Sequence, residues 1–246
     1  AAAVASAGGG GGIRRVRPQL EGEEEFFLVN GDTIQFPRWD ALRAARQTTD
    51  ALAALTLRHP PEGDRFTPVY FDIDLVTGFG NGTGEALMFA GSHVISRRVF
   101  DHLPDRDFSG IVEHVYIPVL ADQRERLAGI VDDGLWFDIG TPQRYLAASS
   151  ALLDAHVRAD SLFHATASGQ AAHSTVGARS VIEGTVRDSI IWDDCHIGRG
   201  VQLERCIVGH GVVLDEGSYS DAVIVRDDSR IPAEYERVGD LVVRPN

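Results

Sequence analysis

Two aspartates that follow apolar segments are the residues of this chain best suited to chemistry on phosphates. Asp32 follows the segment 26–29 and the pair Asn30-Gly31, so an expected buried strand ends in a tight turn at this carboxylate. Asp138 ends a second apolar segment, 135–137. Because ligands of open α/β sheets sit at the carboxyl ends of strands, these two carboxylates could share one Mg²⁺, a hard cation that binds oxygen ligands and phosphates.

Each of these motifs can also be interpreted as a purely structural element. The tripeptide Asn30-Gly31-Asp32 is ordinary turn chemistry by itself. The second motif adds weight, because Asp138 is followed by Thr141-Pro142, which we expect to be the N-cap and first residue of a helix. Asp72 and Asp74 could also form a metal pair, but we interpret them as turn residues of a hairpin between strands at 68–72 and 76–79.

Two longer motifs carry a resemblance to a known family. Leu-Val-Asn-Gly-Asp at 28–32 and Trp-Phe-Asp-Ile-Gly-Thr-Pro-Gln-Arg-Tyr-Leu at 136–146 resemble the sugar-nucleotide pyrophosphorylases, most closely those that make GDP-mannose from mannose 1-phosphate and GTP. The resemblance covers roughly residues 8–225. It implies a nucleotidyltransferase in which a sugar 1-phosphate attacks the α-phosphorus of a nucleoside triphosphate and releases pyrophosphate. The family's catalytic, Mg²⁺-binding aspartates fall on Asp32 and Asp138.

The resemblance also implies positions that bind the substrates. Gly11 and Gly12 match the family's Gly-rich segment at the nucleotide, and we expect them in a loop before a short helix, where backbone N–H groups can approach an anion. A flexible tail is the alternative interpretation of this run. Asn30 and Gly91 match the sugar side, and Gly91 interrupts an apolar strand at 86–96, as a glycine at a close approach does. The family's usual Glu-Lys-Pro sugar contact is absent, which leaves the sugar open.

Composition limits the classes of partner. The chain has 246 residues, 43% of them hydrophobic, and a net charge of -13, which argues against nucleic acid. No stretch reaches the roughly 18 apolar residues of a membrane span. All 23 basic residues are Arg, so Arg, backbone N–H groups and a cation must meet substrate phosphates. Cys195 and Cys206 do not form a secreted disulfide framework, and we predict buried thiols in a cytoplasmic, reducing compartment.

The first part of the chain predicts an α/β domain. Strand, helix and strand between residues 26 and 57 are typical of a crossover in a mainly parallel sheet. With the resemblance, we predict a Rossmann-like, glycosyltransferase-A-type nucleotidyltransferase domain at 1–157, truncated at its N-terminus because the family's signature loop is missing, and a linker at 158–172. His93 alternates with core residues and is interpreted as structural.

From residue 173 the periodicity changes to six. Aliphatic residues lead successive six-residue units, which is the hexapeptide signature of a parallel β-helix. The segments 189–191, 206–208 and 222–224 repeat after 17 and 16 residues, as one coil of three faces requires. We therefore predict a β-helix domain at 173–246, left-handed by resemblance, in a homo-oligomer. Its expected inward positions are Val176, Ile182, Ile191, Ile197, Leu203, Val208 and Leu214.

Two other functions remain open from the sequence. The chain could be a non-catalytic regulatory homologue, or a fragment that binds a sugar nucleotide without turnover, and the missing loop and lysines predict weak triphosphate binding and poor turnover. It could also be a hexapeptide-repeat acyltransferase with His173, His196 or His210 as the base. The acyltransferase interpretation leaves both aspartate motifs unexplained.

Overall fold

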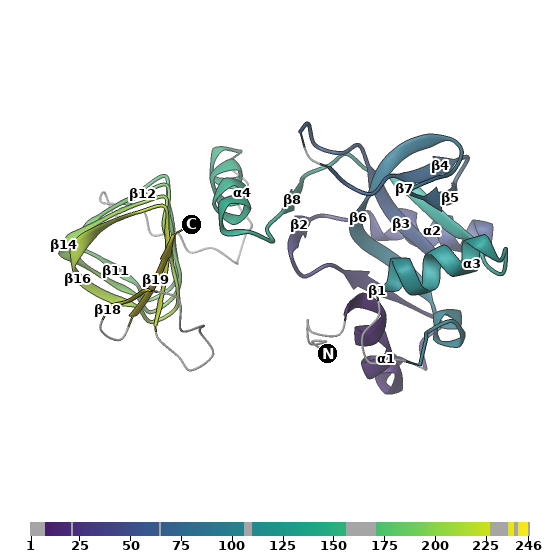
Figure 1. Ribbon diagram of the computed structural model, residues 1–246, viewed down its shortest axis with the longest axis horizontal. Helices are drawn as coiled ribbons and strands as arrows, with labels where there is room; N and C mark the ends of the chain where they lie inside the picture. The colour runs from purple at the N-terminus through teal and green to yellow at the C-terminus, as the bar shows by residue number, and fades with distance from the viewer. Residues whose placement is uncertain are drawn as a thin grey trace. The chain divides into compact units, whose positions relative to one another are not determined.

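The chain separates into two compact units in the computed structural model, Ala1–Trp136 and Phe137–Asn246 (Figure 1). The structure describes residues 8–20, 22–63, 65–105, 110–155, 171–226, 236–238 and 241–245. Most of the predicted linker at 158–172 lies outside these ranges. Within them, no helix has both the length and the apolar character that crossing a bilayer demands.

The first unit is built on a six-stranded sheet with the order β1-β6-β3-β7-β5-β4. β3 and β7 run parallel, while the other neighbours in this sheet are antiparallel. The prediction of a mainly parallel sheet is therefore wrong. The reason is that the β4–β5 hairpin reverses the chain before the long strand β6, which then enters between β1 and β3 against the direction of both. The strands are β1 (Glu25–Val29), β3 (Ala53–Arg58), β4 (Val69–Asp72), β5 (Leu75–Phe79), β6 (Glu85–Ser96) and β7 (Leu127–Val131).

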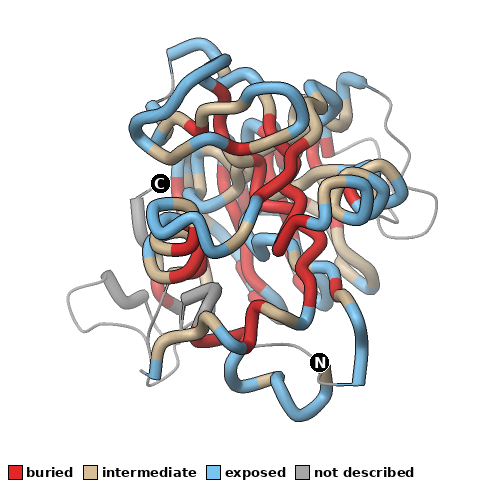
Figure 2. Tube along the Cα trace, turned by 90° about the vertical axis from the view of Figure 1, so that its right-hand side faces the viewer, coloured by how far each residue is buried: buried red, intermediate tan, exposed pale blue. Residues whose placement is uncertain are grey.

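Helical segments cover both faces of this sheet. On one face, Leu42 of α2 (Trp39–Thr49) packs against Ala54, Val94 and Ala128. The other face is covered by α1 (Gly8–Leu20), the 3-10 helix η2 (Arg97–Asp101), the π-helix η3 (Val112–Tyr116) and α3 (Ile117–Ala121). Side chains of a strand alternate between its two faces, so a strand buried on both sides reads as a continuous apolar run. Figure 2 shows this, with the buried stretches following the central strands.

Gly11 and Gly12 lie inside α1 rather than in a loop, so the predicted loop is wrong. The next residue, Ile13, is 1% exposed and belongs to the same core cluster as Phe26 and Phe100. The guanidinium of Arg17 lies 5.3 Å from the ring centroid of Phe100. Such packing stabilises a helix whose glycines disfavour it by roughly 1 kcal/mol each, because tertiary contacts outweigh intrinsic propensity.

The second unit contains the predicted parallel β-helix. One face is the ladder β10, β13, β15 and β17, in which Ile190 pairs with Ile207 and Ile207 with Val223. The long strands β14 and β16 bend across the other two faces, with a register shift between Ile197 and Gly200. Figure 1 looks along the coil and shows its triangular section. The coil strands are β9 (Ala171–Ala172), β10 (Thr175–Val176), β11 (Val181–Ile182), β12 (Thr185–Arg187), β13 (Ile190–Ile191), β14 (His196–Glu204), β15 (Ile207–Val208), β16 (Val213–Ser220) and β17 (Ala222–Arg226).

The predicted inward residues of the coil are confirmed. Ile197 and Val208 are 0% exposed, and of the seven predicted positions only Ile182 is partly exposed while still packing on this core. Cys195 and Cys206 are free thiols inside the same core, and burial raises the pKa of both. After the coil, β18 (Glu236–Val238) and β19 (Leu241–Pro245) form an antiparallel hairpin whose second strand pairs with β17.

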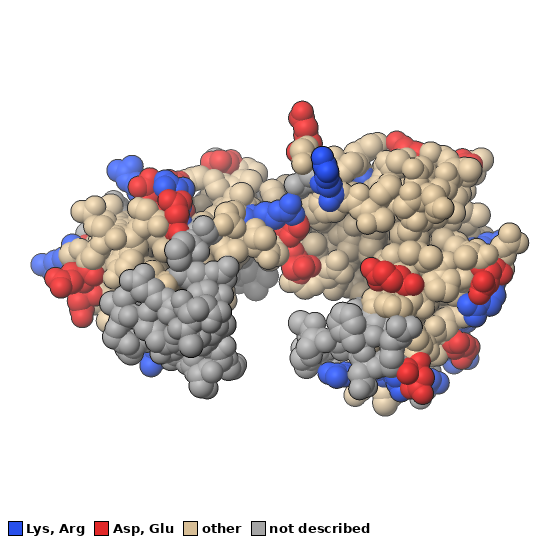
Figure 3. Space-filling model, in the orientation of Figure 1, with Lys and Arg blue, Asp and Glu red and all other residues tan. Residues whose placement is uncertain are grey.

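The outer corners of the coil carry stacked ion pairs. Arg179 and Asp194 both have a positive φ and pair at 2.5 Å, and Arg205 and Asp221 do the same at 2.6 Å. Each pair joins one coil to the next, because its partners are 15 or 16 residues apart. Oppositely charged side chains therefore lie next to one another on the outside of this unit (Figure 3).

Candidate functional site

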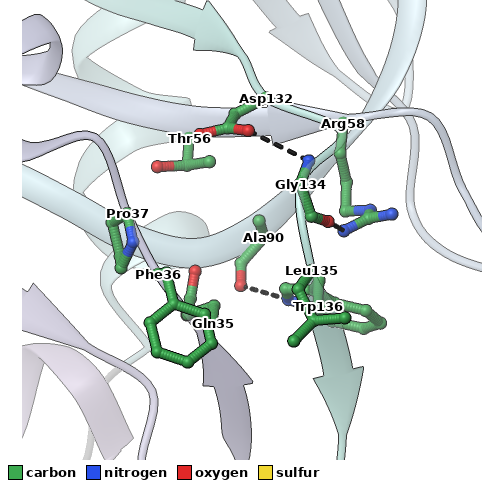
Figure 4. Close-up of a pocket in the computed structure, with 10 residues that line it drawn as sticks. All are labelled: Gln35, Phe36, Pro37, Thr56, Arg58, Ala90, Asp132, Gly134, Leu135 and Trp136. Atoms are coloured by element: carbon green, nitrogen blue, oxygen red, sulfur yellow. Dashed lines mark hydrogen bonds between the residues drawn. The ribbon is translucent and has the colours of Figure 1, made fainter. Parts of the chain in front are cut away.

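A hollow opens in the first unit at the carboxyl ends of its two parallel strands (Figure 4). Thr56 and Arg58 come from the end of β3, and Asp132 follows β7 directly. Ligands of α/β sheets bind at this end of parallel strands, where side chains leave the sheet beside loops that can adapt to a substrate. The hollow is lined by Gln35, Phe36, Pro37, Thr56, Arg58, Ala90, Asp132, Gly134, Leu135 and Trp136.

Arg58 and Trp136 form one wall of the hollow, facing Phe36 and Pro37 across it in Figure 4. The Arg58 guanidinium lies 5.3 Å from the centroid of a Trp136 ring, and its Nη1 donates to the Gly134 carbonyl at 3.0 Å. Trp136 Nε1 donates to the Ala90 carbonyl of β6 at 2.8 Å. A cation and an indole are thus held at fixed places, which suits a ligand with a negative charge and an apolar ring face.

A chain of hydroxyl and amide groups supports the floor of the hollow. Ser92 is 0% exposed, and its Oγ lies 2.8 Å from Thr56 Oγ1 and 2.9 Å from Gln35 Oε1. Because a hydroxyl has one proton, Ser92 donates to the Gln35 oxygen and accepts from Thr56. Gln35 Nε2 in turn donates to Thr33 Oγ1 at 2.8 Å, which fixes the orientation of the Gln35 amide. A network that is satisfied in this way rigidifies the polar groups at its edge.

Asn30 and Gly91, the two predicted sugar-binding residues, contact each other. The Asn30 N–H donates to the Gly91 carbonyl at 2.8 Å. A Cβ atom on Gly91 would lie 2.8 Å from Asn30 Nδ2, and Gly91 has a φ of +92°. The close approach that the glycine indicates in the sequence is therefore an approach to Asn30, and any other residue at position 91 would displace the turn that carries Asp32.

Asp32 and Asp138 lie in different compact units, each at the end of a short strand or turn. Asp32 is exposed in the turn between β1 and β2 (Thr33–Gln35). Asp138 ends β8 (Trp136–Asp138), where its Oδ1 accepts from the Gly140 N–H at 2.7 Å and its Oδ2 pairs with Arg144. Thr141 caps α4 (Pro142–Asp154) by accepting from the Arg144 N–H, as predicted. That the two aspartates share one metal ion stays a prediction.

Comparisons with known proteins find similar sequences among nucleotidyltransferases. Over 231 residues, 92% of its length, the chain is 25% identical to the Mannose-1-phosphate guanylyltransferase of Mycobacterium tuberculosis (strain ATCC 25618 / H37Rv). In an alignment of 154 positions that covers 48% of this chain, it is also 25% identical to the Glucose-1-phosphate adenylyltransferase of Bacillus cytotoxicus. Residues 157–240 match the family of GlmU-like C-terminal hexapeptide domains.

These matches relate the chain by similarity to sugar nucleotidyltransferases. It spans 58% of the length of the guanylyltransferase and 40% of that of the adenylyltransferase. Among solved structures, HddC from Yersinia pseudotuberculosis complexed with GMP-PN is similar, with 17% identity and a TM-score of 0.44 over 57% of this chain and 60% of that one.

The residues that line the hollow were missed as candidate site residues in the sequence. Arg58 follows the buried run 51–57, and Asp132 follows the apolar run 127–131. These are the same signals that identified Asp32, a polar residue directly after an apolar strand. They could have been found by applying that test to every predicted strand. Gly11 and Gly12, predicted at the nucleotide, lie in α1 and are not among the residues of the hollow.

The donor atoms of the predicted metal site fit Mg²⁺. Asp32 and Asp138 offer carboxylate oxygens, and Mg²⁺ in such enzymes is held by one or two carboxylates together with substrate phosphates. In the described parts of the chain, no group of three or more His, Cys, Asp or Glu side chains is arranged around a metal position. The Asp138 carboxylate is matched by the Arg144 cation in this structure, so this position favours positive charge.

The histidines considered for an acyltransferase are spread along the coil. His173 lies between Asp188 at 2.7 Å and Asp154 at 3.1 Å, His196 is 3.7 Å from Glu183, and His210 is 3.6 Å from Asp194. His93 lies in the core as predicted, 0% exposed and with its Nδ1 2.7 Å from the Tyr116 hydroxyl, while its buried Nε2 has no hydrogen-bond partner among the described residues. Asp72 and Asp74 are exposed at the β4–β5 hairpin, as predicted for turn residues.

Proposed function

We propose that this chain carries the sugar-binding part of a nucleotidyltransferase that forms an NDP-sugar, with GDP-mannose as the favoured product. The observation that carries the proposal is the hollow that combines Arg58, Asp132 and Trp136 at the carboxyl ends of β3 and β7. Its support from sequence is the similarity along 92% of the chain to a Mannose-1-phosphate guanylyltransferase.

In the proposed reaction, a phosphate oxygen of the sugar 1-phosphate forms a bond to the α-phosphorus of the triphosphate. The bond from this phosphorus to the bridging oxygen of pyrophosphate breaks, and no protein nucleophile takes part. Catalysis then consists of positioning and charge stabilisation. Arg58 would pair with a phosphate oxygen, Asp132 would accept hydrogen bonds from sugar hydroxyls, and Trp136 would pack against the apolar face of the sugar ring.

The metal assignment is part of the same proposal. Mg²⁺ bound by Asp32 and Asp138 would neutralise charge on the phosphates when the substrates are present. Two ligands of one octahedral ion require carboxylates within about 4 to 8 Å of each other. An experimental structure with Mn²⁺ and a non-hydrolysable triphosphate tests this, and a separation beyond about 12 Å would rule out the shared ion.

The function is tested by pyrophosphate release from a matrix of substrates. The four common nucleoside triphosphates are each combined with mannose, glucose, galactose and N-acetylglucosamine 1-phosphates in the presence of Mg²⁺. We expect one combination, GTP with mannose 1-phosphate, to exceed the others, and we expect chelation by EDTA to abolish it. Turnover of another pair would correct the substrates. No pyrophosphate release from any pair, together with no binding of GDP-mannose by calorimetry, would sink the proposal.

Variants separate the metal ligands from other surface carboxylates. Asp138→Asn and Asp32→Asn should each lower kcat/KM by about 10³-fold, since charge stabilisation supplies most of the rate. The matched control is Asp74→Asn, an exposed carboxylate at the hairpin turn. Equal activity of all three variants would refute the assignment of the metal ligands.

A further inference from the structure

A histidine bound by two carboxylates lies directly beside the hollow. His59 follows Arg58 at the end of β3, Glu85 begins β6, and Asp133 follows Asp132 in the loop after β7. The His59 ring contacts Asp133 Oδ2 through Nδ1 at 2.7 Å and Glu85 Oε1 through Nε2 at 3.0 Å. The His59 backbone N–H also donates to Asp133 Oδ1 at 2.9 Å. One side chain thus connects three chain segments at the edge of the site.

These contacts require the charged form of the ring. An ionised carboxylate can only accept hydrogen bonds, whereas a neutral imidazole donates from one nitrogen and accepts at the other. Both His59 nitrogens face carboxylate oxygens, so both must carry a proton. If the ring loses one proton, it can donate to only one of the two carboxylates, so it no longer connects Asp133 with Glu85.

The segment held by His59 forms the wall of the hollow. Asp132 and Gly134, on either side of Asp133, both line it. Asp132 Oδ1 accepts from the Gly134 N–H at 3.0 Å, and the Gly134 carbonyl accepts from Arg58. Displacement of Asp133 would therefore move the two charged groups of the hollow together.

We propose that His59 is a positioning residue for the substrate site: its charged ring, held between Asp133 and Glu85, fixes the wall 132–136, and substrate binding weakens when the ring loses a proton. The proposal rests on the function proposed above. His59 does not line the hollow, so it acts through Asp133 and through Arg58, its neighbour in the chain.

The charges around His59 give the direction of the pH effect. Hydrogen bonds from the His59 ring to the carboxylates of Asp133 and Glu85 raise the pKa of His59 above its usual 6.5, and the bonds from His59 lower the pKa of Asp133. Arg58 is the other charged group in this cluster, and its positive charge also lowers the pKa of Asp133. A histidine with a raised pKa keeps its interactions below the usual pKa and loses them as pH rises through the raised value. The wall should therefore be ordered below pH 6.5 and released as pH rises through the raised pKa of His59.

The first experiment needs no substrate and follows Trp136 fluorescence. Trp39 and Trp192 are replaced by Phe in the full chain, so that Trp136 is the single emitter, and emission is recorded from pH 5.5 to 9.5. We expect a transition with a midpoint above 6.5 that disappears in His59→Gln and remains in the control His210→Gln. The same transition in His59→Gln, or a flat profile in the parent chain, would overturn the proposal.

The second experiment measures KM for the sugar 1-phosphate between pH 6.5 and 9. We expect KM to rise about tenfold across the transition while kcat changes little, because a displaced wall weakens binding and orientation. His59→Gln should have the high KM at every pH. His59→Arg, which stays charged and has several donors, should restore the low KM and remove the pH dependence. If no substrate is turned over, the proposed function fails, while the Trp136 profile still decides the role of His59.

Discussion

The corners of the coil and the hollow of the first unit use Arg and Asp differently. In the coil, Arg179 pairs with Asp194 and Arg205 with Asp221, so charges on successive coils match each other along the corners. In the first unit, Arg58 and Asp132 stand at strand ends and hydrogen-bond to the backbone of a single residue, Gly134, beside a hollow. At the corners of the coil, the charges of one coil pair with those of the next coil. At the ends of the parallel strands β3 and β7, the charged side chains lie beside space for a ligand.

This contrast assigns different tasks to the two units. The coil stabilises itself through a continuous apolar core and matched corners, as expected of a repeat whose coils contact their neighbours. Among the described residues, both units bury polar side chains: the coil holds Ser174 and Ser189, which donate to its backbone, and the first unit holds the linked hydroxyls of Thr56 and Ser92. Buried polar groups are costly unless they are satisfied, and the Thr56–Ser92 pair is satisfied together with Gln35, which lines the hollow.

The largest effect should come from a charge placed in the coil core. Ile197→Asp introduces a carboxylate at a position that is 0% exposed, and an unpaired buried carboxylate costs several kcal/mol. We expect the coil to unfold while the first unit keeps its structure. The control is Val213→Asp on the same sheet, because Val213 is 54% exposed. Thermal melts followed by Trp192 for the coil and by Trp39 for the first unit distinguish the two, and a coil that melts unchanged in Ile197→Asp would contradict the packing.

Acid should lower the stability of the first unit, by less than Ile197→Asp lowers the stability of the coil. Burial lowers the pKa of His93 to about 3 from the usual 6.5. Above pH 6.5 the ring is neutral in both states, but as pH falls from 6.5 to about 3 only the unfolded chain takes up the proton, so stability is lost across this window. The loss should reach a few kcal/mol.

The acid effect is measured by urea unfolding of the first unit at pH 7, 5 and 4, with Trp39 as the probe. His93→Gln should lower stability at pH 7 but flatten its decline in acid, while His210→Gln keeps the parent slope. An equally steep decline in His93→Gln would assign the acid sensitivity to other groups.

The smallest effect should come from the corner pairs. The Arg205–Asp221 pair is exposed to solvent, where screening and side-chain entropy leave an ion pair little net worth. We expect Arg205→Ala to shift the melting temperature of the coil only slightly, and less in high salt than in low salt. The same melt of Asp221→Ala is the check, and a loss comparable to that of Ile197→Asp would mean that the corners, not the core, hold the coil together.

The sequence predicts the coil better than the sheet, for a physical reason. The period of six and the repeats at 189, 206 and 222 report directly on which residues pair, because each coil pairs with the next. In the first unit, β6 pairs with β1 and β3 across 30 residues or more, and local patterns carry no information on whether these strands run parallel or antiparallel. The strand positions were therefore predictable, and their parallel or antiparallel sense was not.

The candidate site shows the same limit. The alternation of polar and apolar residues marks Gly91 as a close approach, but its neighbour Asn30 lies 61 residues away and could be named only from the fold. Arg58 and Asp132 are strand-end residues by sequence, yet what brings them to one hollow is the parallel register of β3 and β7. The sequence showed which polar residues follow a strand, but it did not show that Arg58 and Asp132 lie at one hollow.

The central claim is that substrates bind at the strand ends of the first unit, and hydrogen exchange of the intact chain tests it most directly. Exchange is measured with and without saturating GDP-mannose and Mg²⁺. Peptides that cover 33–37, 56–59 and 132–136 should be protected by the ligand, and peptides of the coil at 175–191 and 196–214 should exchange as before. Protection confined to the coil, or none at all at saturation, would contradict the account.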